Sequence, residues 1–313
     1  CVIAGFESMR SWLVYESLRT PLGVPMQSVG TYLLRATEDG GYLRAYVTMG
    51  HAIGLGFTAM VAITWQLALA RSFSPPQPAL SGMQRTVNSY APKLLGALVM
   101  LMPVVGLLAS VSRGPWLGCA IAMAIGLSFG AGAKQRVLWM LAALPLLIAA
   151  LLILPQGQKF IDLLPFIGTA DPGSVSYRTL LLDQAMIVFW QSPIVGSLHY
   201  MQHPALESMR QGQGIIDIVN SYVGVGLAYG GIGLALFVAP SAYALWTSWS
   251  TSRRLAQQDP DAEAAGRALA VSMLGVLLVI GAASHYFHIP IVHWMVVSLC
   301  AAFAANALSW RRA

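Results

Sequence analysis

Charged residues are scarce in this sequence. Only 10% of the 313 residues are Asp, Glu, Lys or Arg, whereas 57% are hydrophobic. Because a soluble domain carries roughly 25% charged residues, a chain so poor in charge cannot cover a surface that is exposed to water. The composition therefore excludes a soluble domain. It indicates an integral membrane protein whose surface faces lipid or other helices.

Cysteine is also scarce, and the cysteine positions exclude two further kinds of protein. Of the three cysteines, Cys119 and Cys300 lie within apolar runs, and Cys1 is the first residue. This spacing implies neither a disulfide framework nor a metal site. The chain begins with Cys1 instead of Met and shows no signal peptide, so we expect an N-terminally truncated part of a larger helix bundle.

Long apolar runs, in contrast, are abundant. A transmembrane helix needs about 20 mostly apolar residues, and a helix satisfies its own backbone hydrogen bonds within lipid. Seven runs meet this requirement, and none has Asp, Glu, Lys or Arg in its interior. We therefore predict an all-α polytopic membrane protein with about seven transmembrane helices at His51–Ala70, Leu94–Ser112, Trp116–Ala133, Val137–Leu154, Tyr222–Trp246, Ala268–Ala283 and Pro290–Ser309.

The basic residues predict the orientation of these helices and two long periplasmic segments. If Cys1–Gly50 lies outside, the cytoplasmic segments hold ten of the 18 basic residues and only three of the 12 acidic ones, as the positive-inside rule requires. The basic residues lie between apolar runs and form no stripe, so they do not indicate a nucleic-acid partner. The predicted order is a periplasmic segment (1–50), four transmembrane helices (51–154), a large periplasmic loop (155–221), and three transmembrane helices with a cytoplasmic C-terminus (222–313).

Arginines at the outer face are the first candidate functional residues. Arg113 lies in the turn Ser112-Arg113-Gly114 between two predicted spans, Arg35 and Arg44 precede the first span, and Arg178 lies in the large loop. A guanidinium presents a fixed fork of donors that suits phosphate oxygens. An interfacial arginine that reaches lipid headgroups is the alternative interpretation of Arg113.

Other residues could supply a base or could hold a helix end. His51 begins the first span and could act as an acid or base near neutral pH, although a polar residue that caps a helix has the same pattern. Asp217, Asn220 and Ser221 share one helix face by their i, i+3, i+4 spacing. Asp217 and Asn220 are also typical helix caps.

Two groups of histidines and a group of glycines complete the candidates. His199, His203 and Glu207 have metal-ligand spacing, but Pro204 interrupts the helix that such a site needs, so we predict no metal and no cofactor. A second group near the outer ends of the last two spans could line a cavity or lie at the interface: His285, His288 and His293. Small residues predict a close helix contact at the fifth span: Gly224, Gly226, Gly230, Gly231 and Gly233.

The order of these motifs resembles the O-antigen ligase and O-antigen polymerase family of bacterial envelope glycosyltransferases. The matched motifs are, in order, an Arg and His stretch, a Ser-Arg-Gly turn, a loop arginine with a Pro-x-x-Gly turn, and an Asn-x-Tyr start of a Gly-rich span. They stand here at Leu43-Arg44 through Gly50-His51, Ser112-Arg113-Gly114, Arg178 with Pro193 to Gly196, and Asn220-Ser221-Tyr222 with Gly230 to Leu234. Val219 departs from the pattern, because many relatives have a histidine directly before this asparagine.

The resemblance implies a GT-C-like bundle and a metal-independent glycosyltransferase. A glycan linked to undecaprenyl diphosphate would be transferred to a lipid A core sugar or to another lipid-linked repeat, on the periplasmic face of the inner membrane. The leaving diphosphate needs fixed cations, and Asp217 or His51 would deprotonate the acceptor hydroxyl. The residues expected to bind the diphosphate and the glycan are Arg35, Arg44, Arg113, Arg178, Asn220 and Tyr222.

The main alternative is a membrane transporter or flippase for a lipid-linked or small polar substrate. Such proteins place ionisable residues or broken helices near the membrane midplane. The predicted spans hold no Asp, Glu, Lys or Arg, and no inverted repeat is evident. A scaffold or sensor of an envelope complex is a second alternative. The sequence does not separate a ligase from a polymerase.

Overall fold

The computed structural model describes residues 1–10, 14, 44–72, 83–129, 132–153, 172–210, 214–286 and 288–309. These residues form helices and loops without a strand, so the predicted all-α class is confirmed. The elements are α1 (Val2–Arg10), α3 (Ala52–Ser72), α4 (Met83–Ala109), α5 (Arg113–Leu127), α6 (Ala133–Ile153), α8 (Pro172–Phe189), η2 (Tyr200–Gln202), α9 (Pro204–Glu207), α10 (Ser221–Leu255), α11 (Pro260–Ile280) and α12 (Ile289–Ser309).

Each of the seven predicted spans coincides with a helix, namely α3, α4, α5, α6, α10, α11 and α12. Within the described residues, three helical segments are long and apolar enough to cross a membrane: Ser221–Leu255, Pro260–Ile280 and Ile289–Ala307. Ala52–Gln66, Gly96–Ala109 and Arg113–Leu127 are shorter apolar helices. The chain therefore has the character of a multi-pass membrane protein, while the count of seven spans stays a prediction.

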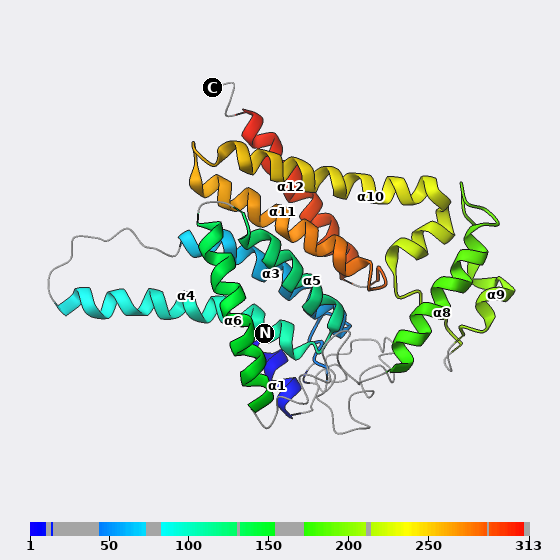
Figure 1. The fold of residues 1–313 in the computed structure, drawn as a ribbon, viewed down its shortest axis with the longest axis horizontal. Helices are drawn as coiled ribbons and strands as arrows, with labels where there is room; N and C mark the ends of the chain where they lie inside the picture. Colours follow the sequence, from blue (N-terminus) through cyan, green and yellow to red (C-terminus); the bar gives the residue numbers. More distant parts are fainter. Residues whose placement is uncertain are drawn as a thin grey trace.

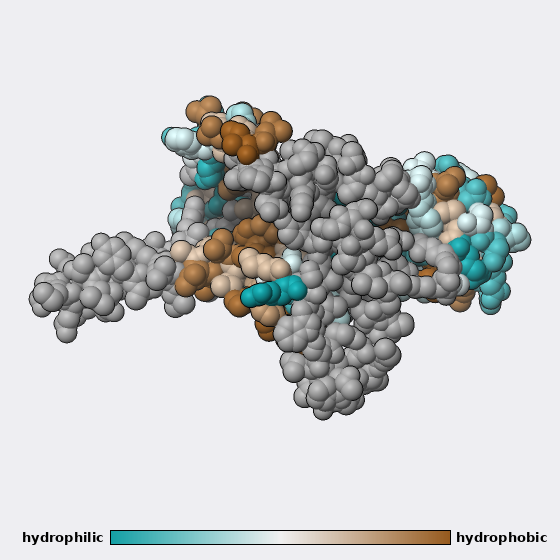
Figure 2. All heavy atoms as spheres, turned by 90° about the horizontal axis from the view of Figure 1, so that it is seen from below, coloured by the Kyte–Doolittle hydropathy of each residue, from teal (hydrophilic) through white to brown (hydrophobic). Residues whose placement is uncertain are grey.

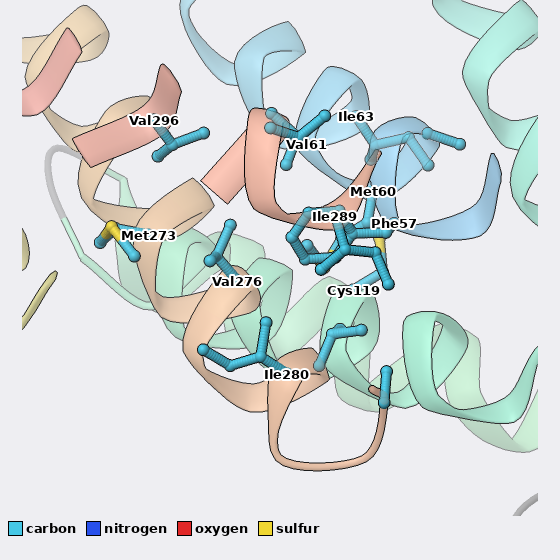
Figure 3. Close-up of a cluster of buried hydrophobic side chains, with 14 of the residues drawn as sticks. Phe57, Met60, Val61, Ile63, Cys119, Met273, Val276, Ile280, Ile289 and Val296 are labelled. Carbon is cyan, nitrogen blue, oxygen red and sulfur yellow. The ribbon is translucent and has the colours of Figure 1, made fainter. Parts of the chain in front are cut away.

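Helix α11 is the centre of the bundle, where it packs against α3, α5, α10 and α12 (Figure 1). Its inward face interdigitates with apolar side chains of α3, α5 and α12 (Figure 3). The helices approach closely at two glycines. A Cβ atom on Gly118 would lie 2.5 Å from Val279 Cγ2, and one on Gly275 would lie 2.8 Å from Met60 Sδ. Small residues at these two positions are therefore what allows α5 and α3 to pack directly on α11.

Polar and apolar residues are distributed unevenly over the molecule. Large hydrophobic side chains are exposed along the bundle helices, for example Leu236 of α10 at 70% and Trp139 of α6 at 67%. Hydrophilic residues are frequent over α8 and α9, which stand beyond one end of α10 (Figures 1 and 2). An apolar helix surface is what contact with lipid requires. The part of the chain with α8 and α9 has the more water-compatible surface.

Candidate functional site

Four loops meet at one end of the bundle, which is the end predicted to face the periplasm. We refer to residues 44–51, 110–114, 214–221 and 281–286 with 288 as the rim. Ala45 N donates to Ala109 O (3.0 Å), and His288 Nδ1 lies 3.1 Å from Met49 O. Ser221 Oγ donates to Ala283 O (2.6 Å). The rim is thus one connected layer that is built from segments far apart in the sequence.

Arg44 is bound to the turn that carries Arg113. Its Nη2 donates to Ser112 Oγ at 2.9 Å, and the Ser112 hydroxyl in turn donates to Ser110 O at 3.0 Å. The Ser112 hydroxyl is therefore used by Arg44 and Ser110, and it makes no capping bond to α5. The first two motifs of the family resemblance, separated by more than 60 residues, form one contact.

Two rim valines adopt backbone conformations that L-residues rarely adopt. Val47 has φ of 49° and Val111 has φ of 44°, and both are β-branched. Such conformations cost of order 1–3 kcal/mol each and cluster at functional sites. The two residues lie close in sequence to Arg44 and Ser112, so the backbone that positions this contact is strained on both sides.

Glu7 of α1 anchors the same stretch, and sequence reasoning missed it. Its carboxylate is fully buried, and Oε2 accepts from Tyr46 N (3.3 Å) and Val47 N (3.2 Å). These hydrogen bonds hold the peptide that follows Arg44 in its unusual conformation. The available signal was a lone acid within a mostly apolar helical segment, because an acid is rarely buried without partners.

Arg113 is the first residue of α5 and is half-buried. The next residue, Gly114, places the turn against the loop between α11 and α12, since a Cβ on Gly114 would lie 3.5 Å from Ala282 Cβ. The N-terminus of a helix carries partial positive charge, which adds to that of the guanidinium. This corner of the rim therefore favours an anion.

Asp217 also contacts the α11–α12 loop. Its Oδ1 accepts from Ser284 Oγ at 2.9 Å, and its main-chain oxygen accepts from Tyr177 of α8 at 3.2 Å. The side chain is half-buried. Ala282 and Ser284 are two residues apart, so the same α11–α12 loop contacts both the turn of Arg113 and the carboxylate of Asp217. Neither the contact of Ser284 nor that of Tyr177 with Asp217 was predicted from the sequence.

The remaining arginines are placed less centrally. Arg178 follows Tyr177 in α8, and its side chain is exposed. Because Tyr177 contacts the main chain of Asp217, Arg178 lies beside the rim but does not belong to it. Arg35 lies outside the described residues. Of the four predicted arginines, Arg44 and Arg113 belong to the rim.

His51 lies outside α3, which begins one residue later than predicted. Its Nδ1 accepts from Ile53 N at 3.1 Å, so the ring caps the helix, as the alternative interpretation of this residue required. Burial and the nearby Arg44 guanidinium lower the pKa of His51 from 6.5 to about 4. The imidazole is therefore neutral at physiological pH, with one nitrogen already used.

Asn220 and Tyr222 are bound within the protein. Asn220 Oδ1 accepts from Tyr222 N (3.0 Å) and Val223 N (3.2 Å), which caps α10. The Tyr222 hydroxyl donates to Leu277 O at 2.6 Å and ties α10 to α11. These bonds occupy the groups that the sequence assigned to the substrate, and the binding role of both residues stays a prediction.

The three C-terminal histidines do not act as one cluster. His285 Nε2 lies 3.1 Å from His293 Nδ1, and His293 Nε2 lies 2.8 Å from Ser241 Oγ. His293 is fully buried between α10 and α12, whereas His288 contacts Met49 at the rim. Burial lowers the pKa of His285, which lies in the α11–α12 loop. His285 and His288 are therefore rim residues, and His293 belongs to the interior of the bundle.

The histidines of the large loop are also used separately. His203 Nδ1 accepts from Ala205 N (3.1 Å), its Nε2 lies 2.7 Å from Gln191 Nε2, and Glu207 forms an exposed ion pair with Arg210. Among the described residues, no three His, Cys, Asp or Glu side chains are placed to hold a metal ion.

The Pro193–Gly196 turn fits into a break in α10. At Gly230 (φ 65°) the helix is interrupted, and a Cβ there would overlap the main chain of Ile194. Gly231 N donates to Pro193 O (2.7 Å) and Ile232 N donates to Ile194 O (3.2 Å), so the turn caps the second part of α10. The predicted close contact at these glycines is present, but it is made with a loop and not with another helix.

Comparison with known proteins agrees with the motif order. Residues 97–238 match the family model described as O-antigen ligase, and this segment runs from within α4 into α10. Arg113, Arg178 and Asp217 lie inside the match, whereas Arg44 and His51 precede it. Comparison with the curated proteins gives no match. The match covers the segment that carries the Ser-Arg-Gly turn, the large loop and the broken helix, and it supports the resemblance to the O-antigen ligase family.

Proposed function

We propose that this protein transfers a glycan from undecaprenyl diphosphate to the hydroxyl of an acceptor sugar at the rim. The acceptor is a lipid A core sugar or another lipid-linked repeat, and the rim faces the periplasm of a bacterial inner membrane that all seven apolar helices cross. The match of residues 97–238 to the O-antigen ligase family model supports a glycan-transferring role in envelope polysaccharide biosynthesis. The basic residues at the opposite end of the bundle support this orientation.

The observation that carries the proposal is the junction at the α11–α12 loop. Ala282 packs on the turn of Arg113, and Ser284 holds Asp217. A cation and a carboxylate therefore both lie at one end of an apolar bundle. At this end a lipid diphosphate in the membrane can approach an acceptor sugar that lies in the water outside it.

The chemistry assigns a role to each group. The acceptor oxygen attacks the anomeric carbon, the bond from that carbon to the diphosphate oxygen breaks, and the diphosphate leaves with the electron pair. Arg113 stabilises the developing negative charge, with Arg44 behind it on Ser112. The proton of the acceptor hydroxyl passes to Asp217, which acts as the general base.

Asp217 is a better base than His51 for two reasons. The Nδ1 atom of His51 is occupied by its capping bond to Ile53 N. Asp217 is fixed by Ser284, and a carboxylate has more than one lone pair with which to accept a proton.

The proposal is tested with purified protein in lipid nanodiscs. Undecaprenyl-diphosphate glycan from the source strain is supplied with either lipid A core or a second lipid-linked repeat, and the product is followed on gels. The wild type is expected to consume the donor with one of the acceptors, and Asp217→Asn is expected to remove most of the activity. Arg210→Ala, an exposed arginine of the large loop with its own ion pair to Glu207, is the matched control and should retain activity. Failure of the wild type with both acceptors would overturn the proposal.

A further inference from the structure

The large loop contains a cavity that lies apart from Arg113 and Asp217. Its volume is about 540 Å³, and it lies between the end of α8, the Pro193–Gly196 turn, η2 and the first part of α10. Sites for small molecules typically span 300–1,000 Å³. The polar part of its lining consists of side chains that both donate and accept hydrogen bonds, chiefly Gln191, Ser192, Ser197, Tyr200, Gln202 and His203.

Among the residues that the structure describes, the polar part of the lining contains no Asp, Glu, Lys or Arg. Amides and hydroxyls both donate and accept, and sugar hydroxyls require the same combination. A phosphate, in contrast, is bound by Arg, Lys or several converging backbone N–H groups. The composition of the cavity therefore favours an uncharged polyol over the diphosphate or the lipid.

The cavity wall is held in place before any ligand binds. His203 and Gln191 are in contact at 2.7 Å, and Ser192 Oγ donates to Gly196 O at 2.9 Å. The Gly196 backbone fits directly against the break at Gly230, and Ser197 N donates to Leu227 O at 2.9 Å. A wall fixed in this way loses little freedom on binding, which favours affinity.

Tyrosines lie in the cavity, against its wall and in the rim. Tyr200 lines the cavity, and the backbone of Tyr229 lies against its wall, because a Cβ on Gly196 would lie 2.5 Å from Tyr229 N. Burial, and to a smaller extent the phenols of Tyr286 and Tyr229, raise the pKa of Tyr200 to about 12. Tyr229 and Tyr286 are 54% and 55% exposed. Tyr286 belongs to the loop that also contacts Gly114 and Asp217. An aromatic ring offers an apolar face together with a polar tip, which suits the C–H face and the hydroxyls of a sugar ring.

We propose that this cavity, whose lining includes Tyr200 and whose wall lies against Tyr229, binds uncharged sugar residues of the glycan behind the reacting end. The identity of the ligand rests on the proposed function. The diphosphate end of the chain lies at Arg113, and more distant sugars pass along the tyrosines into the large loop. In this arrangement the cavity binds the distant sugars of the glycan, whereas the reaction takes place at the rim.

The test measures binding separately from transfer. The probe is the surface polysaccharide of the source strain, freed of lipid by mild acid, and it is titrated into full-length protein in nanodiscs by calorimetry. Tyr200→Ala is expected to weaken its binding at least tenfold, and Gln202→Ala several-fold. Tyr200→Phe keeps the ring and should stay within about threefold. Because Gln202 is exposed, its substitution leaves the fold intact.

The controls separate this inference from the proposed function. Glu207→Gln, an exposed substitution in the adjacent helix, should bind like the wild type. Because the described part of the lining has no Asp, Glu, Lys or Arg, binding should be unchanged between 50 mM and 500 mM salt. Wild type that fails to bind the polysaccharide, or Tyr200→Ala and Gln202→Ala that bind it normally, would overturn the inference even if transfer is active. Normal binding without transfer to either acceptor would instead overturn the proposed function.

Discussion

Arginines lie at both ends of α5, but the helix dipole favours a cation at one end and disfavours it at the other. At its C-terminal end, Arg136 Nη2 and Arg267 Nη1 donate to Phe129 O at 2.6 and 2.9 Å. Cations near the last carbonyls of a helix are stabilised by typically 0.3–1 kcal/mol. At its N-terminal end, Arg113 is the first residue, where the same helix dipole opposes a cation. The arginines at the C-terminal end are thus stabilised by main-chain carbonyls, whereas Arg113 stands where the proposed diphosphate would add a negative charge.

The largest expected effect comes from removing Arg113. Arg113→Ala should lower the rate of glycan transfer roughly 10²–10³-fold, because a fixed donor to the leaving diphosphate is lost. Thermal stability should stay the same or rise slightly, because an unfavourable charge at the helix N-terminus disappears. Transfer assays and unfolding scans on the same sample measure both quantities. A variant that loses stability instead of activity would contradict the functional assignment of Arg113.

The next effect concerns the break in α10. Gly230→Ala should destabilise the large loop by about 3 kcal/mol or more, since a positive φ and an overlap with Ile194 act together. Faster proteolysis of the loop would report this change. Gly224→Ala is the matched control, because a Cβ there meets only Ile218 Cγ2 at an ordinary 3.6 Å. Equal protease resistance of both variants would show that the Pro193–Gly196 turn does not depend on this break.

Arg267 tests the other end of α5. Arg267→Met should cost about 3 kcal/mol of stability, because it removes the hydrogen bond to Phe129 O and breaks the largely buried ion pair with Glu263. Transfer per folded molecule should not change. The melting temperature in nanodiscs and the specific activity test this pair of expectations, and a selective loss of activity would remove the contrast between the two ends.

The smallest effect is expected for His51. Its pKa of about 4 lies below the ordinary value of 6.5, so the ring gains a proton only as the pH falls toward 4. Any contribution of neutral His51 is therefore constant from pH 5.5 to pH 8 and is lost below that range. The profiles of kcat/KM against pH for wild type and His51→Gln should have the same shape over this range. A wild-type decline centred on pH 6.5 that the variant lacks would identify His51 as the base.

The helices were predictable because a segment in lipid must be apolar and must satisfy its own backbone hydrogen bonds. Each apolar run must be helical, and all seven runs are helices in the structure. Capping by Asn220 was also foreseeable, because an amide before a helix has a local partner two residues on. The rim was predictable only in part. Its arginines appeared as motifs, but the contact of Ser284 with Asp217 joins loops 67 residues apart and leaves no periodic pattern.

Gly230 also shows that the sequence does not reveal which distant segment a residue contacts. Gly230 was predicted to make a close approach, which is correct, but the partner was expected to be a helix. Small residues reveal that something lies near the backbone and not what it is. The conformation of Val47 and Val111 could not be inferred at all, because β-branched residues normally avoid positive φ.

The capped break in α10 also bears on how the protein is made. Pro193 and Ile194 supply the carbonyls that Gly231 and Ile232 need, and they precede the helix in the chain. During synthesis the turn therefore leaves the ribosome before the segment that it caps. When Gly231 arrives at the membrane, partners for its first amides already exist, so the helix need not present bare N–H groups to lipid. Assembly of the loop and insertion of the helix can follow the order of the sequence itself.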